Sequence, residues 1–504
     1  MPSPRIVACL LSVLAVAPLS AQSNGSRDVV RELDAYFAKA AKDWNVPGLA
    51  VAVVHKGQLV LARGYGVREV GKPEPIDTQT IFAIASTTKA ITAAALGMLI
   101  DEGKVRWDDP VTKYVPSFEM YDPWATREVT VRDLITHRAG LPNADYLWTG
   151  GDNSRDEVIR RLRFIPPSYS FRGGYTYHNV MYTVAGAVIE AASGMTWDEF
   201  VRRRIFQPLG MTRSVTTLAE AATKDNRAQP HGSRGDTLRM SGNSLADGIG
   251  PAGSVWSSVA DMSKWVRFLL DTGRVNGRPL LTAATWSDLF RPVTMLPPWN
   301  NNSAPQLRMS RPHFRTYALG WFQQDYQGRQ VDFHTGSLTG MIAINGLIRE
   351  EGIGVYILSN TSTEIRHPLM FKVFDTFMGM PPRDWSGEML ALQRADDARD
   401  DSANTRTVNQ RVEGTRPSLA LDRYAGTFVD SLYGRVTVSM ENGALRYRFS
   451  STQAGTLEHW QFETFRVVWD DWWRGRSTVT FVVGPNGSAD RLEVGNFVLR
   501  RARR

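Results

Sequence analysis

The stretch IFAIASTTKAITAAALGML, residues 81–99, holds one serine and one lysine, Ser86 and Lys89, among residues that are otherwise apolar or small. No charge follows Lys89 in this stretch, which predicts a buried helix. Positions i and i+3 share one face of a helix, so we expect the hydroxyl and the amine to lie side by side in its first turn. Burial lowers the pKa of an amine, and a neutral amine can take the proton of a neighbouring hydroxyl.

The start of this helix offers a second reason for chemistry at Ser86. Helix N-termini carry partial positive charge and free N–H groups, and such groups stabilise an alkoxide or an oxyanion. The structural alternative is an N-capping serine followed by a lysine whose amine reaches solvent. The pattern S-x-x-K occurs once in the chain, and by itself it does not decide between catalysis and capping.

The segment GGYTYHNVMYTVAGAVIE, residues 173–190, contains Tyr177 and Asn179 in the only Y-x-N of the chain, just before an expected helix. A phenol near an amine can exchange protons with it, and the asparagine offers a donor and an acceptor to an amide-like substrate. The structural alternative is a tyrosine packed at the start of a helix with Asn179 as its cap.

The segment DFHTGSLTGM, residues 332–341, contains His334, Thr335, Gly336 and Ser337. A strand that ends in T-G-S exposes a backbone N–H to close approach, because Gly336 has no side chain. A histidine can titrate near neutrality, but a lone histidine is more often a buried structural residue, and the sequence leaves both alternatives open for His334. His137, in LITHRAGLP, has no partner at metal-ligand spacing and is interpreted as structural.

In this order, the three elements resemble the penicillin-recognising serine hydrolase superfamily of peptidase family S12 type. That group includes class C β-lactamases, D,D-carboxypeptidases, D-aminopeptidases and related esterases. The stretches LITHRAGLP (134–142) and GPAGSVWSSVADMSKW (250–265) resemble segments that flank the site in the family. The resemblance covers roughly residues 27–380.

The resemblance implies a role for each residue of the site. Ser86 would be the acylated nucleophile and Lys89 its base, while Tyr177 would carry the proton to the leaving group and help to activate water. Asn179 would bind an amide of the substrate. The backbone N–H groups of Ser86 and Ser337 would form the oxyanion hole.

The substrate-binding strand departs from the β-lactamase pattern at one position. By resemblance, residues 334–337 would all contact substrate, but His334 stands where classical β-lactamases have lysine. That lysine usually faces the carboxylate of the antibiotic, and a histidine there is common in the peptidase and esterase branches. The resemblance therefore favours those branches over antibiotic destruction.

The chain divides into four segments. Residues 1–21 look like a secretory signal peptide, because a single arginine precedes a short apolar run and small residues. The resemblance implies an α+β domain at 27–380, with a central antiparallel sheet flanked by helices and an all-helical subdomain. A polar linker at 381–417, helical in its first half, leads to a small all-β barrel at 418–504. That barrel resembles the lipocalin-like modules of some self-compartmentalising peptidases.

Composition excludes several function classes. Lysine and arginine number 59 against 51 acidic residues, without a basic block, so we expect no nucleic-acid partner. The only cysteine, Cys9, lies in the signal segment, which leaves no thiolate chemistry in the mature chain. We expect no metal, no cofactor and no stable membrane anchor, because no zinc, phosphate-binding or spanning motif is present.

These patterns predict a secreted or periplasmic serine hydrolase that cleaves an amide or ester through an acyl-enzyme on Ser86. Weak β-lactamase activity would be compatible with the site. The alternatives are a non-catalytic penicillin-binding-type sensor and a ligand-binding protein that uses the barrel. We expect the barrel to restrict access to the site or to join copies of the chain into a homo-oligomer.

Overall fold

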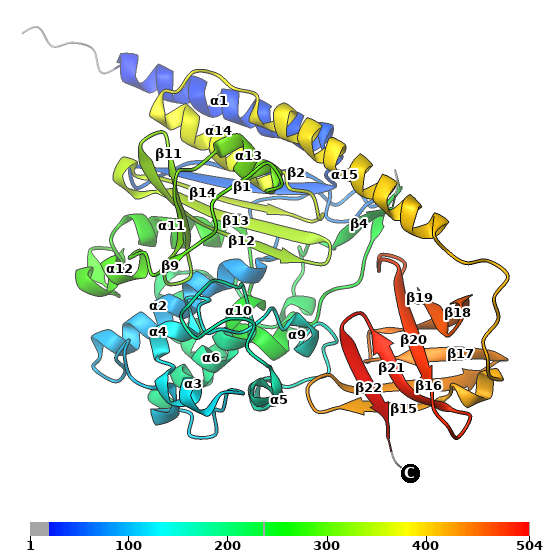
Figure 1. The fold of residues 1–504 in the computed structure, drawn as a ribbon. Helices are drawn as coiled ribbons and strands as arrows, with labels where there is room; N and C mark the ends of the chain where they lie inside the picture. The colour runs from blue at the N-terminus through cyan, green and yellow to red at the C-terminus, as the bar shows by residue number, and fades with distance from the viewer. Residues whose placement is uncertain (1–19, 235–236, 503–504) are drawn as a thin grey trace, which may run out of the picture.

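The computed structural model describes residues 20–234 and 237–502, which form a mixed helix-and-sheet body and a closed β-barrel beside it (Figure 1). The expected α+β class with a C-terminal barrel is confirmed. Of the expected signal peptide, residues 1–19 lie outside the described part of the chain. Among the described residues, none of the helices combines the length and the apolar character that a membrane span requires.

The body is organised around one antiparallel sheet of eight strands. Across the sheet the order is β2 (Gln58–Gly66), β1 (Gly48–His55), β14 (Ile353–Ser359), β13 (Met341–Ile348), β12 (Arg329–Leu338), β11 (Phe322–Tyr326), β10 (Arg315–Tyr317) and β9 (Thr294–Met295). The N-terminal hairpin therefore lies next to β14, a strand that arrives about 300 residues later.

Side chains alternate between the two faces of this sheet. Leu49, Val51 and Val53 of β1 belong to one core, and Ala50 and Ala52 belong to the other. The helices α1 (Ser20–Asp43), α14 (Arg366–Met378) and α15 (Trp385–Asn409) cover the first face (Figure 1). The second face packs against α11 (Val259–Leu270) and the segment that carries Ser86.

A helical subdomain extends from that second face. Its longest helices, α2 (Thr88–Asp101) and α6 (Val180–Ser193), pack against each other. The α6 helix ends at Gly194, which adopts a left-handed φ of 72°, as the sequence predicts for a closing glycine. The shorter helices are α3 (Pro123–Glu128), α4 (Val131–Leu134), α5 (Arg155–Arg161), α7 (Trp197–Val201), α8 (Gln207–Leu209), α9 (Leu218–Ala222), α10 (Gly250–Gly253) and α12 (Ala283–Leu289). The short α13 (Pro305–Ser310) lies on the first face of the sheet instead, where it packs against α15 (Figure 1).

Three pairs of short strands complete the body. They are β3 (Phe82–Ala83) with β6 (Trp256–Ser257), β4 (His231–Arg234) with β5 (Thr237–Met240), and β7 (Arg274–Val275) with β8 (Arg278–Pro279). The β3–β6 pair ties the segment before the nucleophile to the segment after α10. This pairing joins parts of the chain that are about 170 residues apart.

The barrel closes through eight antiparallel strands. In chain order they are β15 (Gly426–Asp430), β16 (Gly434–Glu441), β17 (Ala444–Arg448), β18 (Ala454–Gln461), β19 (Thr464–Trp469), β20 (Ser477–Val483), β21 (Ala489–Val494) and β22 (Phe497–Arg501). Its core contains aromatic rings 5.1–5.9 Å apart, among them Tyr424, Phe428, Phe465 and Phe481. Small barrels are filled in this way by their own side chains.

The barrel is joined to the body by chain and by contact. The expected linker region contains α15, whose first turn packs against α14 through Trp385 and Phe371, with ring centroids 4.7 Å apart. Further along, the Ser451 amide donates to Asp152 at 2.9 Å and the Trp472 indole donates to the Met240 carbonyl at 3.1 Å. These contacts place two barrel loops, 450–454 and 470–474, against the body.

Candidate active site

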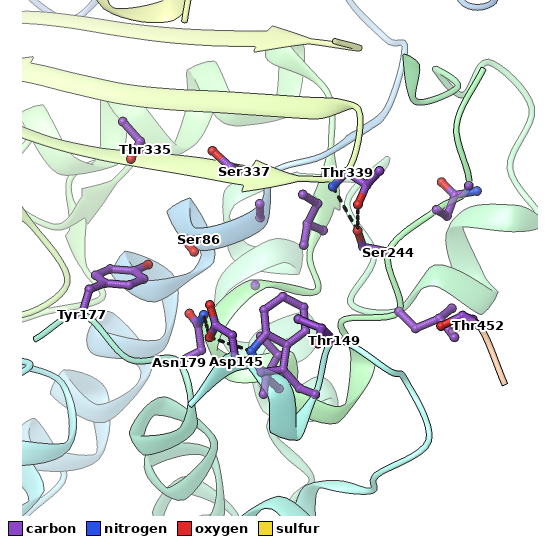
Figure 2. A pocket seen from close by; sticks show the side chains of 18 of the residues that line it. Ser86, Asp145, Thr149, Tyr177, Asn179, Ser244, Thr335, Ser337, Thr339 and Thr452 are labelled. Atoms are coloured by element: carbon purple, nitrogen blue, oxygen red, sulfur yellow. Dashed lines mark hydrogen bonds between the residues drawn. The ribbon is translucent and has the colours of Figure 1, made fainter. Parts of the chain in front are cut away.

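Ser86 lies in a tight turn between β3 and α2. Residues 84–87, which we call the nucleophile turn, include the 3₁₀ segment η1 (Ala85–Thr87). The sequence predicts Ser86 in the first α-helical turn, whereas α2 begins at Thr88. Ala85 has a φ of 49°, a left-handed conformation that a non-glycine residue adopts only under constraint. This turn directs the Ser86 hydroxyl into the cleft, between Tyr177 and Asn179, below the strand that carries Ser337 (Figure 2).

Lys89 lies beside Ser86, as the sequence predicts, and its side chain is 0% exposed. Its Nζ is 3.1 Å from Ser86 Oγ, 2.6 Å from Asn179 Oδ1 and 3.0 Å from the carbonyl oxygen of Ala252. Burial lowers the pKa of Lys89 well below its usual value, against the opposing charge of Asp145. A neutral amine has two N–H bonds for the two carbonyl oxygens, so its lone pair is left for the Ser86 hydroxyl.

Tyr177 packs over the same amine, with Lys89 Nζ 4.8 Å from its ring centroid. His137 lies against the ring on one side, at 4.4 Å between centroids, and Phe322 stacks on it at 6.2 Å. Burial raises the pKa of Tyr177 well above its usual value, although the Ser86 hydroxyl acts in the opposite direction. The phenol is therefore protonated and is suited to donate a proton.

Asn179 connects Lys89 to a residue that the sequence does not single out, Asp145. Asn179 Nδ2 donates to Asp145 Oδ1 at 2.8 Å, and the Trp148 indole donates to the same oxygen at 2.8 Å (Figure 2). Because an ionised carboxylate only accepts hydrogen bonds, Asp145 fixes the amide with its nitrogen towards the carboxylate. The amide oxygen then faces Lys89.

The substrate-binding strand is the second half of β12. β11 pairs with residues 329–333, and residues 334–338 pair with β13 alone, so their other edge is open to the cleft. Thr335 and Ser337 line that cleft (Figure 2). A Cβ at Gly336 would lie 2.1 Å from the Ile84 carbonyl oxygen. Only glycine allows the nucleophile turn to approach the strand so closely.

His334 lies behind the cleft and is 1% exposed. Its Nε2 is 2.9 Å from the hydroxyl of Tyr317, and its Nδ1 is 2.6 Å from the carbonyl oxygen of Thr335. Burial, together with the nearby Lys89, lowers the pKa of His334 to about 3. Of the two alternatives for His334, the structure supports the buried structural histidine, because the ring is desolvated. At pH 7 it supplies no positive charge at the position where β-lactamases have lysine.

His137 is buried and contributes by packing rather than by ligation. Its Nδ1 accepts a hydrogen bond from the His178 amide at 3.3 Å, and burial lowers its pKa well below the usual value. Among the described residues, no group of three histidine, cysteine, aspartate or glutamate side chains is placed to hold a metal ion. The neutral ring supports the phenol of Tyr177 from below.

The cleft in front of Ser86 has a volume of about 1150 Å³ and is shared between the body and the barrel. At one end lie Tyr175, Tyr177 and Arg315 of the body. At the other end lie Ser244 and Thr339, whose hydroxyls are 2.9 Å apart, with the barrel loops beyond them (Figure 2). The barrel residues in its wall are Ser451, Thr452, Ala454, Asp470, Asp471, Trp473 and Arg474.

The structure thus brings all eight candidate site residues from the sequence to one place. Tyr177, Asn179, Thr335 and Ser337 lie around the pair Ser86 and Lys89, and His334 and Gly336 lie in the strand behind. It adds Asp145, the Ala252 carbonyl and the barrel loops to the site. A lone aspartate in a polar loop, a main-chain carbonyl and a distant barrel carry no local motif. Their contributions depend on tertiary contacts.

Comparison with known proteins agrees with this geometry. The family model described as Beta-lactamase matches residues 33–369. The chain belongs to the Beta-lactamase family. A second family model, described as a domain of unknown function (DUF3471), matches residues 410–501, which include the barrel. The family fixes the fold and the general class of this protein, a β-lactamase-fold serine hydrolase family.

Curated relatives of the family include two fungal hydrolases and a staphylococcal protein. The chain is 28% identical over 476 residues to the unguisins hydrolase ungD of Aspergillus violaceofuscus, covering 86% of this chain and 81% of that protein. It is 27% identical over 447 residues to ungD′ of Aspergillus campestris, covering 81% and 78%. Protein flp of Staphylococcus aureus is 22% identical over 342 residues, covering 67% and 64%.

Two solved structures share the whole arrangement. The octameric penicillin-binding protein homologue from Pyrococcus abyssi is 21% identical, with a TM-score of 0.61, covering 93% of this chain and 99% of that one. SurE is 18% identical, with a TM-score of 0.56, covering 96% and 100%. These likenesses establish the fold of both parts of the chain.

Proposed function

We propose that this protein is a serine hydrolase that cleaves an amide or ester bond through an acyl-enzyme on Ser86. The observation that carries the proposal is the set of three contacts around Lys89 Nζ, at 3.1, 2.6 and 3.0 Å. Two of these partners are carbonyl oxygens, Asn179 Oδ1 and the Ala252 main-chain oxygen, which can only accept a hydrogen bond. The lone pair of a neutral amine is then directed at the one remaining partner, the Ser86 hydroxyl.

The reaction follows from the protonation states. Lys89 takes the proton of Ser86 as Oγ attacks the carbonyl carbon, and the negative charge that develops on the carbonyl oxygen lies between the N–H groups of Ser86 and Ser337. The protonated phenol of Tyr177 gives its proton to the leaving atom as the bond breaks, and Lys89 restores it. In the second half of the reaction these proton transfers run in reverse. A water molecule gives its proton to Tyr177 and attacks the acyl carbon, which breaks the bond to Ser86 and releases the acyl group.

The position of Tyr177 orients the substrate in the cleft. Because the leaving atom must reach the phenol, the leaving group lies towards Tyr175 and Arg315. The acyl group then extends the other way, past Ser337 and Thr339, towards barrel residue Trp473. The barrel would therefore contact the acyl half of the substrate. The expected restriction of access would apply at that end of the cleft.

The names of two relatives support a hydrolase, and Asn179 favours a substrate that carries an amide. Both relatives are called unguisins hydrolases, and Asn179 Nδ2 keeps one N–H beyond its bond to Asp145 for an amide of the substrate. With a neutral His334, the strand offers no cation for an antibiotic carboxylate, which argues for peptidase or esterase activity over β-lactamase activity.

Intact-mass spectrometry with a fluorophosphonate tests the proposal. We expect one adduct on the wild-type chain and none on Ser86→Ala, since only an activated hydroxyl is phosphonylated. Lys89→Ala should slow the reaction about 10²–10⁴-fold, the range for loss of a positioned general base. An unlabelled wild-type protein, or an adduct that persists in Ser86→Ala, would refute the assignment of the nucleophile.

Incubation with a penicillin separates turnover from trapping. A short-lived adduct means hydrolysis, whereas an adduct stable for hours would support the sensor alternative. The barrel does not support the ligand-carrier alternative, because packed aromatic rings fill the interior in which a ligand would bind.

The proposal also covers the cellular location of the protein and the association of its copies. The N-terminal segment supports a secreted or periplasmic location, which is tested by fractionation of cells that express the full chain and by N-terminal sequencing of the product. Association of copies through the barrel is tested by light scattering, and a monomer at micromolar concentration would count against it.

A further inference from the structure

Arg366 is a buried cation directly behind the substrate-binding strand. It stands at the first position of α14, and only 5% of its surface is exposed. Its Nη1 donates to the carbonyl oxygen of Gly336 and to Ser337 Oγ, the latter at 2.8 Å, and lies 3.3 Å from the carbonyl oxygen of Ala343. Nothing in the proposed reaction uses this guanidinium.

The Gly336 carbonyl belongs to the same peptide unit as the Ser337 N–H. In a trans peptide these two groups point in opposite directions, so Arg366 binds one end of the unit while the other end faces the open edge of β12. A cation that donates to the carbonyl draws electron density from the amide and makes its N–H a stronger donor, because hydrogen bonds in a chain polarise one another.

Packing holds this arrangement from both faces of the strand. The nucleophile turn presses on Gly336 from one face, where a Cβ would meet Ile84. From the other face, α14 holds Arg366, whose Nη2 is 3.0 Å from Glu364 Oε1. Although burial opposes it, hydrogen bonding from His367 and the charge of Arg366 lower the pKa of Glu364 to about 2, so the carboxylate stays ionised at neutral pH.

We propose that Arg366 is a positioning residue that polarises the Gly336–Ser337 peptide and thereby strengthens the oxyanion-hole N–H of Ser337. This inference rests on the proposed acyl-enzyme reaction. It adds to the site an element that acts without touching substrate. Removal of a whole oxyanion-hole donor costs about 10²–10³-fold in rate, so removal of its polarising partner is expected to cost about 10-fold.

Three variants separate this role from a purely structural one. Arg366→Met removes the charge and the donors, Arg366→Lys keeps the charge without the planar fork, and Glu364→Gln breaks the ion pair while leaving the donors on Gly336. Each is compared with the wild type for the rate of Ser86 phosphonylation. Infrared difference spectra of an acyl-enzyme with a ¹³C-labelled arylacryloyl carbonyl report directly on hydrogen bonding in the oxyanion hole.

We expect Arg366→Met to react about 10-fold more slowly and to move the acyl carbonyl stretch to higher frequency. Arg366→Lys should fall between this variant and the wild type, and Glu364→Gln should match the wild type in both measurements. A wild-type stretch in Arg366→Met, or an equal loss in Glu364→Gln, would overturn the inference. If Arg366→Met does not fold by circular dichroism, Arg366→Lys decides, and a wild-type stretch there overturns it. Absence of any Ser86 adduct in the wild type would instead refute the proposed function.

Discussion

Replacement of Asp145 tests how the base is oriented. Its Oδ1 accepts from Asn179 Nδ2 at 2.8 Å, and Asn179 Oδ1 in turn lies 2.6 Å from Lys89 Nζ. In Asp145→Ala the amide loses the partner that sets its orientation, and a flipped amide would present an N–H to the lone pair that Ser86 needs. Asp145→Asn keeps an oxygen for Asn179 but removes the negative charge.

The expected magnitudes follow from these contacts. A buried hydrogen-bonding group left without a partner costs about 1–3 kcal/mol, which corresponds to about 5–150-fold in rate. We therefore expect Asp145→Ala to lower the rate of Ser86 phosphonylation by about 10–100-fold. In Asp145→Asn, loss of a charge that raises the pKa of Lys89 lowers that pKa further. Lys89 then stays neutral down to a lower pH, so the acid limb of the pH–rate profile shifts to lower pH.

The assay measures phosphonylation rates by intact mass between pH 5 and 10. Asn143→Ala is the matched control. This exposed amide donates to the other oxygen of Asp145 at 3.2 Å and to the Tyr177 carbonyl at 3.4 Å, and accepts from the Asp145 amide at 3.0 Å; none of these bonds reaches Lys89 or the Asn179 side chain. We expect the control to change the rate less than twofold. An unaltered rate in Asp145→Ala, or an acid limb that moves to higher pH in Asp145→Asn, would refute this account of how Lys89 is oriented.

Three other predictions concern the strand, the buried histidines and the barrel. Gly336→Ala would place a Cβ 2.1 Å from a backbone oxygen of the nucleophile turn and should abolish labelling of the serine, whereas Gly475→Ala, with nothing within 4 Å, should label normally. Burial lowers the pKa of His334 from 6.5 to about 3 and that of His178 from 6.5 to about 4. On acidification the unfolded chain therefore binds protons before the folded chain does, so the free energy of unfolding at pH 5 should be lower than at pH 7 by about 2 kcal/mol for each ring. Equal urea midpoints at the two pH values would contradict this. Trp473→Ala should lower kcat/KM about 10-fold for long acyl esters and less than twofold for acetyl esters, and equal losses for both would place the acyl group elsewhere.

The residues of the candidate site were predictable because three short motifs stand in the order of a known family, and within each motif the geometry is local. Ser86 and Lys89 meet within one turn, and Gly336 reports a close approach through its missing side chain. The environment of these groups was not predictable. The sequence left the titration of His334 open, because the desolvation of a ring depends on how neighbouring elements pack around it, here Tyr317 and the end of β12.

The sequence alone predicted the fold class and the candidate reacting groups, because three motifs stand in the order of a known family. Ser86 and Lys89, three residues apart, need only local backbone geometry to meet. The tertiary structure decided the pKa values, the orientation and the hydrogen-bond partners of these groups. Asp145, the Ala252 carbonyl and Arg366 come from segments 56 to 280 residues away from Ser86 or Lys89 along the chain. Their electrostatic effect depends on distance in space and on the exclusion of water, and the spacing of residues along the chain predicts neither.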